Sequence, residues 1–383
     1  MKFTCEKNIL LKVLTNISRS VATKSNIPAL EGINIIVNKS CVLFESFNME
    51  FGIKTSINIL NNISNIEEGA IVVPAKLFID IIKSLPDSLI LFETKKLEIL
   101  INCLDSNFSI SGISSEDFPK LPETEDEKEI IISSKIIKNV IQQTIFAVAD
   151  NIENASVHTG ELWDLKNNIL TVVAVDGFRM ALRNEPVDIS ENFKVIIPGK
   201  ALAEVLRLLP SDEENIKIYI SERYVFFKFS NYTFLSRLLE GNFIDYVSAV
   251  PSECTTKVKI NVKNAMSSLD RVAVVISDHL QSPVKAVINP DSIFKLSCHT
   301  SVGRSNDEFS AEVEGKAIEI AFNDRYMLDA LKNTDSDEVF LEFTSSLKPI
   351  KIVPLNGNSF VFLVLPVRIK DEDEGIAKNG WKR

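Results

Sequence analysis

The sequence has few of the residues from which catalytic centres are usually built. It contains only 3 histidines, and none is followed at metal-motif spacing by a second histidine or a cysteine; they are His158, His279 and His299. Its 13 glycines form neither a phosphate loop nor a Gly-x-Ser-x-Gly elbow. Asp176, Arg179 and His158 could form an acid–base site only if the fold brought them together. We therefore expect a protein that is not an enzyme and that needs no metal or cofactor.

Long apolar runs and ordered cysteine spacings are also absent. No run approaches the roughly 20 residues that span a bilayer, and the N-terminus lacks a secretory apolar segment. The 5 cysteines are scattered, with neither metal-type nor redox-type spacing: Cys5, Cys41, Cys103, Cys254 and Cys298. These absences predict a cytoplasmic protein without a membrane segment, whose cysteines are buried, reduced thiols.

An excess of positive charge is missing as well. The net charge of −10 argues against a generally basic nucleic-acid binder. However, the expected helical segments carry 13 basic and 6 acidic residues, a net +7, which leaves −17 for the remainder; they are 6–20, 75–84, 134–147, 199–209, 262–275 and 323–333. If the helices share one face, that face attracts a polyanion. No helix carries a base-reading cluster, so contacts to DNA would be to phosphates.

What the sequence does have is a threefold repeat of one charged helical pattern. A basic, an acidic and a second basic residue recur about 125 residues apart, and three phenylalanines keep nearly the same period. The residues are Lys76, Asp80 and Lys83; Lys200, Glu204 and Arg207; Arg325, Asp329 and Lys332; and Phe108, Phe234 and Phe360. A repeat of this length is a domain rather than a solenoid module. Pairing within a helix, such as Asp80 with Lys76 and Lys83, would also explain the pattern.

Each repeat is predicted to contain a strand, a helix, several strands, a second helix and further strands. Apolar residues from Leu202 to Leu209 follow helical spacing, Pro74 and Pro198 are expected in the first turn of a helix, and Asn323 is expected to be an N-cap. Short runs rich in Ile, Val and Phe between the helices predict mainly antiparallel sheets. The result is an α+β fold of three repeated domains. The boundaries are residues 1–126, 127–252 and 253–369, followed by a loose polar tail, 370–383.

Five motifs follow one another along the chain. They are Met1-Lys2-Phe3-Thr4, Val73-Pro74-Ala75-Lys76, Ala174-Val175-Asp176-Gly177-Phe178-Arg179-Met180-Ala181, Phe322-Asn323 with Tyr326 and Leu328-Asp329, and Leu365-Pro366-Val367-Arg368-Ile369. Together they resemble the bacterial DNA polymerase III sliding clamp family, over residues 1 to about 369. The resemblance implies the DNA clamp fold, in which head-to-tail homodimers form a ring with sheets outside and two helices per domain lining the hole. Such a ring is a processivity factor in DNA replication.

The resemblance implies partners and DNA contacts. A clamp loader places the ring around double-stranded DNA, where it slides and tethers the replicative polymerase and other replication and repair proteins. Sliding requires weak contacts, because a base-specific contact worth roughly 1 to 3 kcal/mol would hold the ring in place. By position, the residues expected to face DNA are Arg19 and Lys24, then Lys12, Lys76, Lys83, Lys138, Lys200, Arg207, Lys263, Arg271 and Lys332.

The resemblance also implies a pocket for a short hydrophobic peptide between the second and third domains. Its residues by position are Val175, Gly177, Phe178, Arg179, Met180, Ile244, Ala249, Asn323, Tyr326, Leu363, Val364, Leu365, Pro366, Val367 and Arg368. Apolar side chains with a few polar groups suit an anchor peptide. The sequence departs from the family at Phe178, usually His, at Ile244, usually Pro, and at Ser248, usually basic. From its residues alone, Asp176-Gly177 indicates only a hairpin turn.

For the dimer interface, positional matching suggests Phe108 and Ile110 at one end of the chain and Val275 and Ile276 at the other. Head-to-tail contacts need two different, complementary ends. Both pairs could equally be core residues. A further alternative is a peptide-binding scaffold that never encircles DNA; it would share the pocket, but its function would not need the basic helices.

Overall fold

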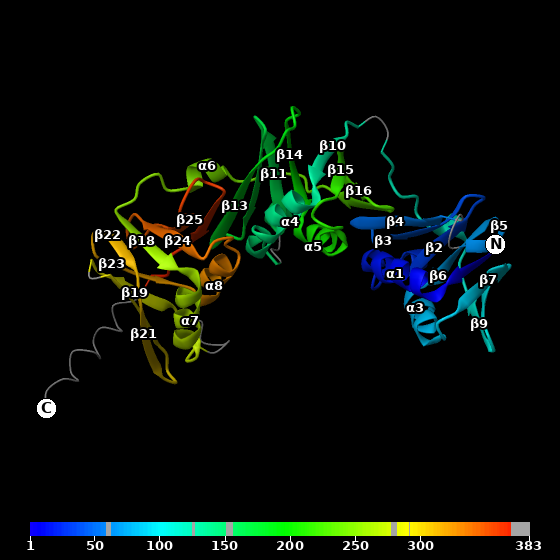
Figure 1. The fold of residues 1–383 in the computed structure, drawn as a ribbon, viewed down its shortest axis with the longest axis horizontal. Coiled ribbons are helices and arrows are strands. Elements are labelled where there is room, and N and C mark those ends of the chain that lie inside the picture. Colours follow the sequence, from blue (N-terminus) through cyan, green and yellow to red (C-terminus); the bar gives the residue numbers. More distant parts are fainter. Residues whose placement is uncertain (59–62, 125–126, 151–155, 277–281, 291, 369–383) are drawn as a thin grey trace. The chain divides into compact units, whose positions relative to one another are not determined.

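The computed structural model describes residues 1–58, 63–124, 127–150, 156–276, 282–290 and 292–368 (Figure 1). The expected tail, 370–383, lies outside these residues. The chain divides into two compact units, Met1–Lys138 with Lys200–Leu238, and Asn139–Gly199 with Leu239–Arg383. The middle third of the chain therefore contributes to both units.

The three thirds of the chain repeat one order of elements among the described residues, except that the second has one strand fewer between its two helices. The first contains β1 (Lys2–Glu6), α1 (Lys7–Ile17), β2 (Gly32–Val37), β3 (Cys41–Phe47), β4 (Phe51–Asn58), β5 (Ile63–Glu67), β6 (Gly69–Pro74), α3 (Ala75–Ser84), β7 (Leu89–Lys95), β8 (Glu98–Cys103) and β9 (Ser106–Ser111). The second contains β10 (Ile130–Ser133), α4 (Ser134–Gln142), β11 (Gly160–Lys166), β12 (Ile169–Val175), β13 (Arg179–Pro186), β14 (Phe193–Pro198), α5 (Gly199–Leu208), β15 (Asn215–Ile220), β16 (Tyr224–Phe229) and β17 (Tyr232–Arg237).

The last third begins after a single helical turn, α6 (Tyr246–Ala249). It contains β18 (Thr256–Asn261), α7 (Val262–Ala273), β19 (Val284–Ile288), β20 (Ile293–His299), β21 (Arg304–Ser310), β22 (Glu312–Gly315), β23 (Ile318–Phe322), α8 (Asp324–Lys332), β24 (Glu338–Phe343), β25 (Ile350–Pro354) and β26 (Phe360–Val364). All the strand pairs of the sheets are antiparallel among the described residues, so the predicted α+β class is confirmed.

The second helix of each repeat begins close to its predicted residue. Asn323 is the N-cap of α8, and its side-chain oxygen accepts a hydrogen bond from Tyr326 N at 3.1 Å, as expected. The prediction that Pro74 and Pro198 lie in the first turn of a helix was wrong by one residue. Each is the last residue of a strand and directly precedes the helix. Both strands, β6 and β14, lie at the edge of a sheet, where a missing N–H removes no ladder bond.

Two long sheets join neighbouring repeats. In the first unit an 8-stranded sheet has the order β10-β15-β16-β17-β4-β3-β2-β6, and in the second a 9-stranded sheet has the order β14-β11-β12-β13-β26-β25-β24-β18-β22. In the first sheet Phe234 of β17 lies opposite Ile53 of β4. In the second, Phe362 of β26 lies opposite Ala181 of β13. The last strand of one repeat thus pairs with the third strand after the first helix of the preceding repeat.

The two smaller sheets end in β9 and β21, the strands of the first and last repeats that occupy the same places as the joining strands of the long sheets. Their orders are β5-β1-β7-β8-β9 and β21-β20-β19-β23. Among the described residues, β9 pairs only with β8, and β21 pairs only with β20. By the repeat, β9 corresponds to β17 and β26, whereas β21 corresponds to β4 and β13. The first and the last third of the chain therefore each contain one of the two strands that form a joint between neighbouring repeats.

The helices pack on the sheets through apolar stripes. In α1, Leu10, Val13, Leu14 and Ile17 are buried, and this helix contacts α3 as well as β3 and β4. In the last third, α7 contacts α8 and strands β20 and β21 (Figure 1). The opposite faces of these helices remain exposed, which leaves their charged residues on the surface.

The five cysteines are free thiols, as predicted. Their expected burial holds for Cys5, Cys103 and Cys298 but is wrong for Cys254, which is exposed, and Cys41 is only partly buried. Cys254 lies in the connection that precedes β18, outside any strand. Scattered spacing was therefore a sound argument against a disulfide but not an argument for burial.

A buried carboxyl group holds the end of α4 against β11. Glu161 is fully buried; its Oε2 accepts a hydrogen bond from Trp163 Nε1 at 3.2 Å, and its Oε1 lies 2.9 Å from Thr144 Oγ1. Thr144 Oγ1 also lies 2.6 Å from Val140 O. A threonine hydroxyl has one proton. If Thr144 donates it to Val140 O, protonated Glu161 supplies the second hydrogen bond of this chain.

Burial raises the pKa of Glu161 to about 8, well above the ordinary value of 4.5 for a glutamate. Protonated Glu161 therefore stabilises the fold fully below about pH 4.5, and this contribution is lost as the pH rises through about 8.

We expect Glu161→Gln, whose amide can donate to Thr144 and accept from Trp163, to flatten the fall in the free energy of unfolding between pH 6 and 9. Urea denaturation at a series of pH values measures it, with exposed Glu222→Gln as the control. The same pH slope in Glu161→Gln and the parent would contradict a protonated, buried Glu161.

Candidate binding sites

An exposed aromatic residue lies on the turn between β12 and β13. Asp176 Oδ1 accepts hydrogen bonds from Phe178 N at 2.9 Å and Arg179 N at 3.0 Å, and Gly177 has φ +90°, a conformation that glycine adopts without strain. The hairpin turn indicated by Asp176-Gly177 is thus present. The turn leaves the Phe178 side chain 60% exposed.

Behind Phe178, Arg179 joins two carboxylates and two aromatic rings. Its Nε donates to Asp176 Oδ2 at 2.9 Å, and one terminal nitrogen donates to Asp329 Oδ2 of α8 at 2.5 Å. Its guanidinium carbon lies 4.6 Å from the ring centre of Tyr326 and 5.6 Å from that of Phe146. Tyr326 in turn stacks with Phe178, with ring centres 6.1 Å apart and planes 21° from parallel.

The segment after β26 continues this surface. Leu365 N donates to Phe178 O at 2.9 Å, and Val367 N donates to Ala321 O at 2.8 Å. These bonds hold 365–367 in an extended conformation beside the turn. Leu365 and Val367 are 39% and 40% exposed. Together with Phe178 they form an apolar surface that we call the turn surface.

The connection between β17 and β18 covers an apolar face of the long sheet in the second unit. Phe243, Ile244, Tyr246 and Val250 pack against a buried cluster; its members are Leu162, Val173, Val175, Met180, Leu182, Ile196 and Leu363. Tyr246 Oη donates to Asp164 Oδ2 of β11 at 3.1 Å, and burial raises the pKa of Tyr246 to about 12. This packing places the connection beside the strands that carry the turn surface.

The departures at Ile244 and Ser248 have structural roles in this connection. Ile244 packs on the buried cluster. Asp245 is the N-cap of α6, and its Oδ1 accepts a hydrogen bond from Ser248 N at 3.4 Å. The Ser248 hydroxyl donates to Asp245 Oδ2 at 2.6 Å, and this hydrogen bond is the main cause of a lowered pKa of Asp245. Where the family usually has a basic side chain, the connection therefore presents a serine held by an acid.

The fold brings together most of the residues predicted for the pocket. Val175, Met180 and Leu363 belong to the buried cluster, and Phe178, Arg179, Tyr326, Leu365 and Val367 lie at or beside the turn surface. Val364 is buried as well. The remaining predicted residues lie around these: Gly177 in the turn, Ile244 and Ala249 in the connection, Asn323 at the N-cap of α8, and Pro366 and Arg368 after β26.

The sequence analysis missed Asp329 and Phe146 as contacts of Arg179. The sequence marks Asp329 as the acidic member of the charged repeat and as part of the Leu328-Asp329 motif, but not as a partner of Arg179. The two residues lie 150 positions apart, so no local pattern links them.

The basic residues predicted to face DNA fall into two groups. Most are exposed on helices or in the loop that follows α1: Lys12, Lys24, Lys76, Lys83, Lys200, Arg207, Lys263, Arg271 and Lys332. Arg19 and Lys138 are half-buried in ion pairs instead, Arg19 with Glu204 at 3.2 Å and Lys138 with Asp212 at 2.7 Å. Their charges are thus partly compensated within the fold, as is that of Arg271, which pairs with Asp307.

The acidic member of the charged repeat has a different environment in each copy. In the first, Asp80 has no ion pair among the described residues, so the alternative of pairing with Lys76 and Lys83 is not observed. In the second, Glu204 pairs with both Arg207 and Arg19. In the third, Asp329 pairs with Arg179. Among the ion pairs of the described residues, the acid holds a basic residue of its own helix in the second copy, where Glu204 pairs with Arg207.

At the two sheet ends, the residues suggested for a dimer interface differ in exposure. Phe108 on β9 is 37% exposed, whereas Ile110 is buried. Val275 and Ile276 are partly buried against the core at the end of α7, while the neighbouring Val274 is 81% exposed. Val302, in the turn before β21, is also exposed. Positional matching suggested Val275 and Ile276, but it could not indicate that the neighbouring Val274 is the residue whose side chain is exposed.

Over the described ranges, the structure has no cluster of three or more residues that could hold a metal ion. A search of the same ranges found no helix long and apolar enough to cross a membrane.

Comparison with known proteins identifies the family. Three family models match in succession: the DNA polymerase III beta subunit N-terminal domain at residues 1–122, its central domain at 131–245 and its C-terminal domain at 247–368. The chain is 34% identical over 375 residues to a beta sliding clamp of Staphylococcus aureus and 32% identical over 377 residues to that of Bacillus subtilis, covering 96% of this chain and 99% or 100% of theirs. A crystal structure of the DNA polymerase sliding clamp from B. subtilis superposes with a TM-score of 0.94 at 31% identity, over 97% of this chain and 100% of that one. The chain therefore belongs to the family of the DNA polymerase III beta subunit, the sliding clamps of bacterial DNA replication.

Proposed function

We propose that two copies of this non-catalytic processivity factor close head to tail into a ring in the cytoplasm, and that the ring slides on duplex DNA while partner proteins bind at the turn surface. The observation that carries the proposal is the pairing of the repeats. Two of three equivalent strand joints are made within the chain, and the strands of the third, β9 and β21, are left at the sheet edges.

The dimer follows from that pairing. An unpaired edge strand exposes backbone N–H and C=O groups that can extend a ladder into another chain. If β9 of one copy pairs with β21 of the second, the joint repeats those of β17 with β4 and β26 with β13. Such a contact is heterologous, so a pair of them closes a two-chain ring. In the proposed joint, Phe108 and Ile110 lie on β9 of one copy, and Val275 and Ile276 lie at the end of α7, which packs on β21, of the other.

The DNA contacts follow from the charge pattern. Exposed lysines recur on the first or second helix of every repeat, whereas the chain as a whole is net −10. Long, mobile ammonium groups hold phosphates without reading bases and exchange them readily, which permits sliding. Arg19 and Lys138 act as weaker contacts, because Glu204 and Asp212 already neutralise much of their charge.

The partner site follows from the turn surface. Phe178, Leu365 and Val367 are exposed apolar side chains held by backbone hydrogen bonds, and the charge of Arg179 beneath them is balanced by carboxylates. Such a surface suits apolar side chains of a short peptide from the replicative polymerase, the clamp loader or a repair protein. With Phe in place of the usual His, it offers a larger apolar contact and no ring nitrogen.

Neutralising helix lysines tests the DNA interface. We expect the triple substitution Lys76→Gln, Lys83→Gln and Lys200→Gln to weaken binding to a short duplex at low salt at least fivefold, because phosphate contacts release counterions. Fluorescence anisotropy of a labelled duplex over a salt series measures it. The matched control removes the same charge from exposed lysines outside the helices, Lys39, Lys95 and Lys295, and we expect a change of less than twofold. Equal weakening by both triples would reduce the effect to net charge and support the scaffold alternative.

Placing a charge on the β9 edge tests the ring. We expect Phe108→Asp to weaken the dimer at least tenfold, because a carboxylate would be buried in the new joint. In sedimentation velocity experiments, the variant should then sediment as the 42.8 kDa monomer at concentrations where the parent protein is a dimer. Ile169→Asp, at an exposed position of β12 away from both edges, is the control. Dimers of unchanged stability in Phe108→Asp would contradict pairing through β9.

A further inference from the structure

We propose that Asp329 is a positioning residue of the partner site: it holds Arg179 in place and thereby sets the affinity of the turn surface for a partner peptide. The inference rests on the proposed function of that surface. Asp329 does not belong to the surface itself, since it lies on α8 behind Arg179.

The two carboxylates around Arg179 have different tasks. Asp176 belongs to the same turn, and its Oδ1 is occupied by the N–H groups of Phe178 and Arg179, which leaves Oδ2 for the guanidinium. Asp329 comes from the last third of the chain and binds a terminal guanidinium nitrogen at 2.5 Å. Asp176 therefore shapes the turn, whereas Asp329 ties the turn to α8.

That tie controls the support of Phe178. Tyr326 lies three residues before Asp329 on α8, so both side chains project from neighbouring turns of one helix face. The Tyr326 ring contacts the guanidinium at 4.6 Å and stacks with exposed Phe178. Without the Asp329 carboxylate, Arg179 keeps only its ion pair with Asp176. The guanidinium is then no longer fixed against the Tyr326 ring, which stacks with Phe178.

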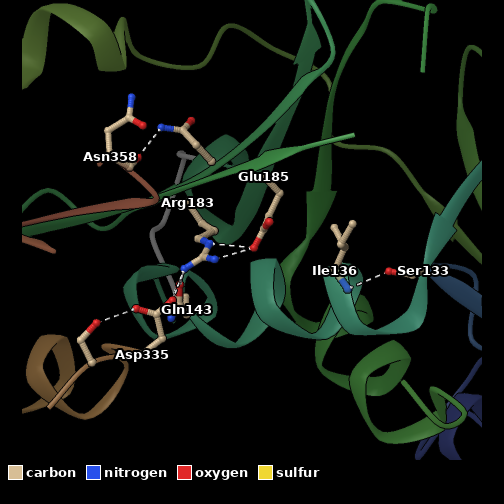
Figure 2. Close-up of polar contacts among 9 residues, drawn as sticks. Ser133, Ile136, Gln143, Arg183, Glu185, Asp335 and Asn358 are labelled. Carbon is tan, nitrogen blue, oxygen red and sulfur yellow. Dashed lines mark hydrogen bonds and ion pairs between the residues drawn. The ribbon is translucent and has the colours of Figure 1, made fainter. Parts of the chain in front are cut away.

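A second ion pair keeps α8 docked when Asp329 is changed. Arg183, four residues further along β13, is buried and donates at 2.6 Å to both Gln143 Oε1 and Asp335 Oδ2, beyond the end of α8 (Figure 2). Glu185 Oε1 accepts two further hydrogen bonds from Arg183. Because this cluster is independent of Asp329, we expect Asp329→Asn to fold and to retain the position of α8.

The strength of the effect follows from partial burial. The side chains of Arg179 and Asp329 are 13% and 38% exposed, so solvent screens the pair only in part. A charge-assisted hydrogen bond of this kind is stronger than a neutral one. We expect Asp329→Asn to weaken peptide binding about fivefold, because an amide keeps the shape but removes the charge.

The test measures fluorescence anisotropy of a labelled ten-residue peptide that carries the clamp-contacting apolar segment of the cognate replicative polymerase. The variants are Asp329→Asn, Asp329→Glu, Arg179→Ala and the double variant of Arg179→Ala with Asp329→Asn. The threefold repeat supplies the matched control, Asp80→Asn, which removes the equivalent carboxylate from α3, where it has no ion pair among the described residues.

We expect Asp329→Glu to recover most of the affinity and Asp80→Asn to leave it unchanged. In the Arg179→Ala background, Asp329→Asn should have no further effect, since Asp329 acts through Arg179. Parent-like affinity of Asp329→Asn, or full additivity in the double variant, would overturn the positioning role while leaving the partner site standing. Failure of the parent itself to bind the peptide would overturn the partner site as well.

Discussion

The antiparallel ladder between one repeat and the next is the interaction on which the rest of this structure depends. It joins β17 to β4 and β26 to β13, so each long sheet contains strands from two thirds of the chain. Backbone hydrogen bonds leave little freedom of register where one face of a strand is buried. The same rule that forms these joints leaves β9 and β21 as two different sheet edges among the described residues, and two different edges suit a head-to-tail contact between copies of the chain.

The joint in the second unit also builds the turn surface. Pairing of β13 with β26 places Arg179 opposite Val364, which brings the turn after β12 next to the segment that follows β26. The same pairing lets Arg179 and Arg183 reach carboxylates at and beyond α8. A single acidic position of the repeat has thus acquired a separate role here. Asp80 remains on a solvated helix face, Glu204 holds two arginines, and Asp329 supports the turn.

Local patterns in the sequence were enough to predict the helices, the threefold repeat and the N-cap Asn323. Each of these depends on residues close together in the chain. The errors arise where tertiary context decides. Cys254 is exposed because its segment lies outside the sheets. The burial of Val364, which alternation along β26 turns inward, and the exposure of Val274 beside partly buried Val275 likewise depend on the folded neighbours.

The members of the candidate site came largely from resemblance, because its residues are spread from Val175 to Arg368. Ion pairs such as that of Arg179 with Asp329 join positions 150 residues apart and leave no periodic signal. The charge on the helices was visible in the sequence. Its partial neutralisation was not, since Arg19 meets Glu204 only after α5 and the loop following α1 are folded together.

We propose that the protein holds DNA by enclosing it in a ring rather than by strong contacts to bases or phosphates. The most direct test is the lifetime of the protein on circular DNA after loading by its cognate clamp loader, measured before and after the circle is cut. We predict long retention on the closed circle and rapid loss through the free ends of the linear product. Equal lifetimes on the two forms would contradict enclosure and assign retention to ordinary surface binding.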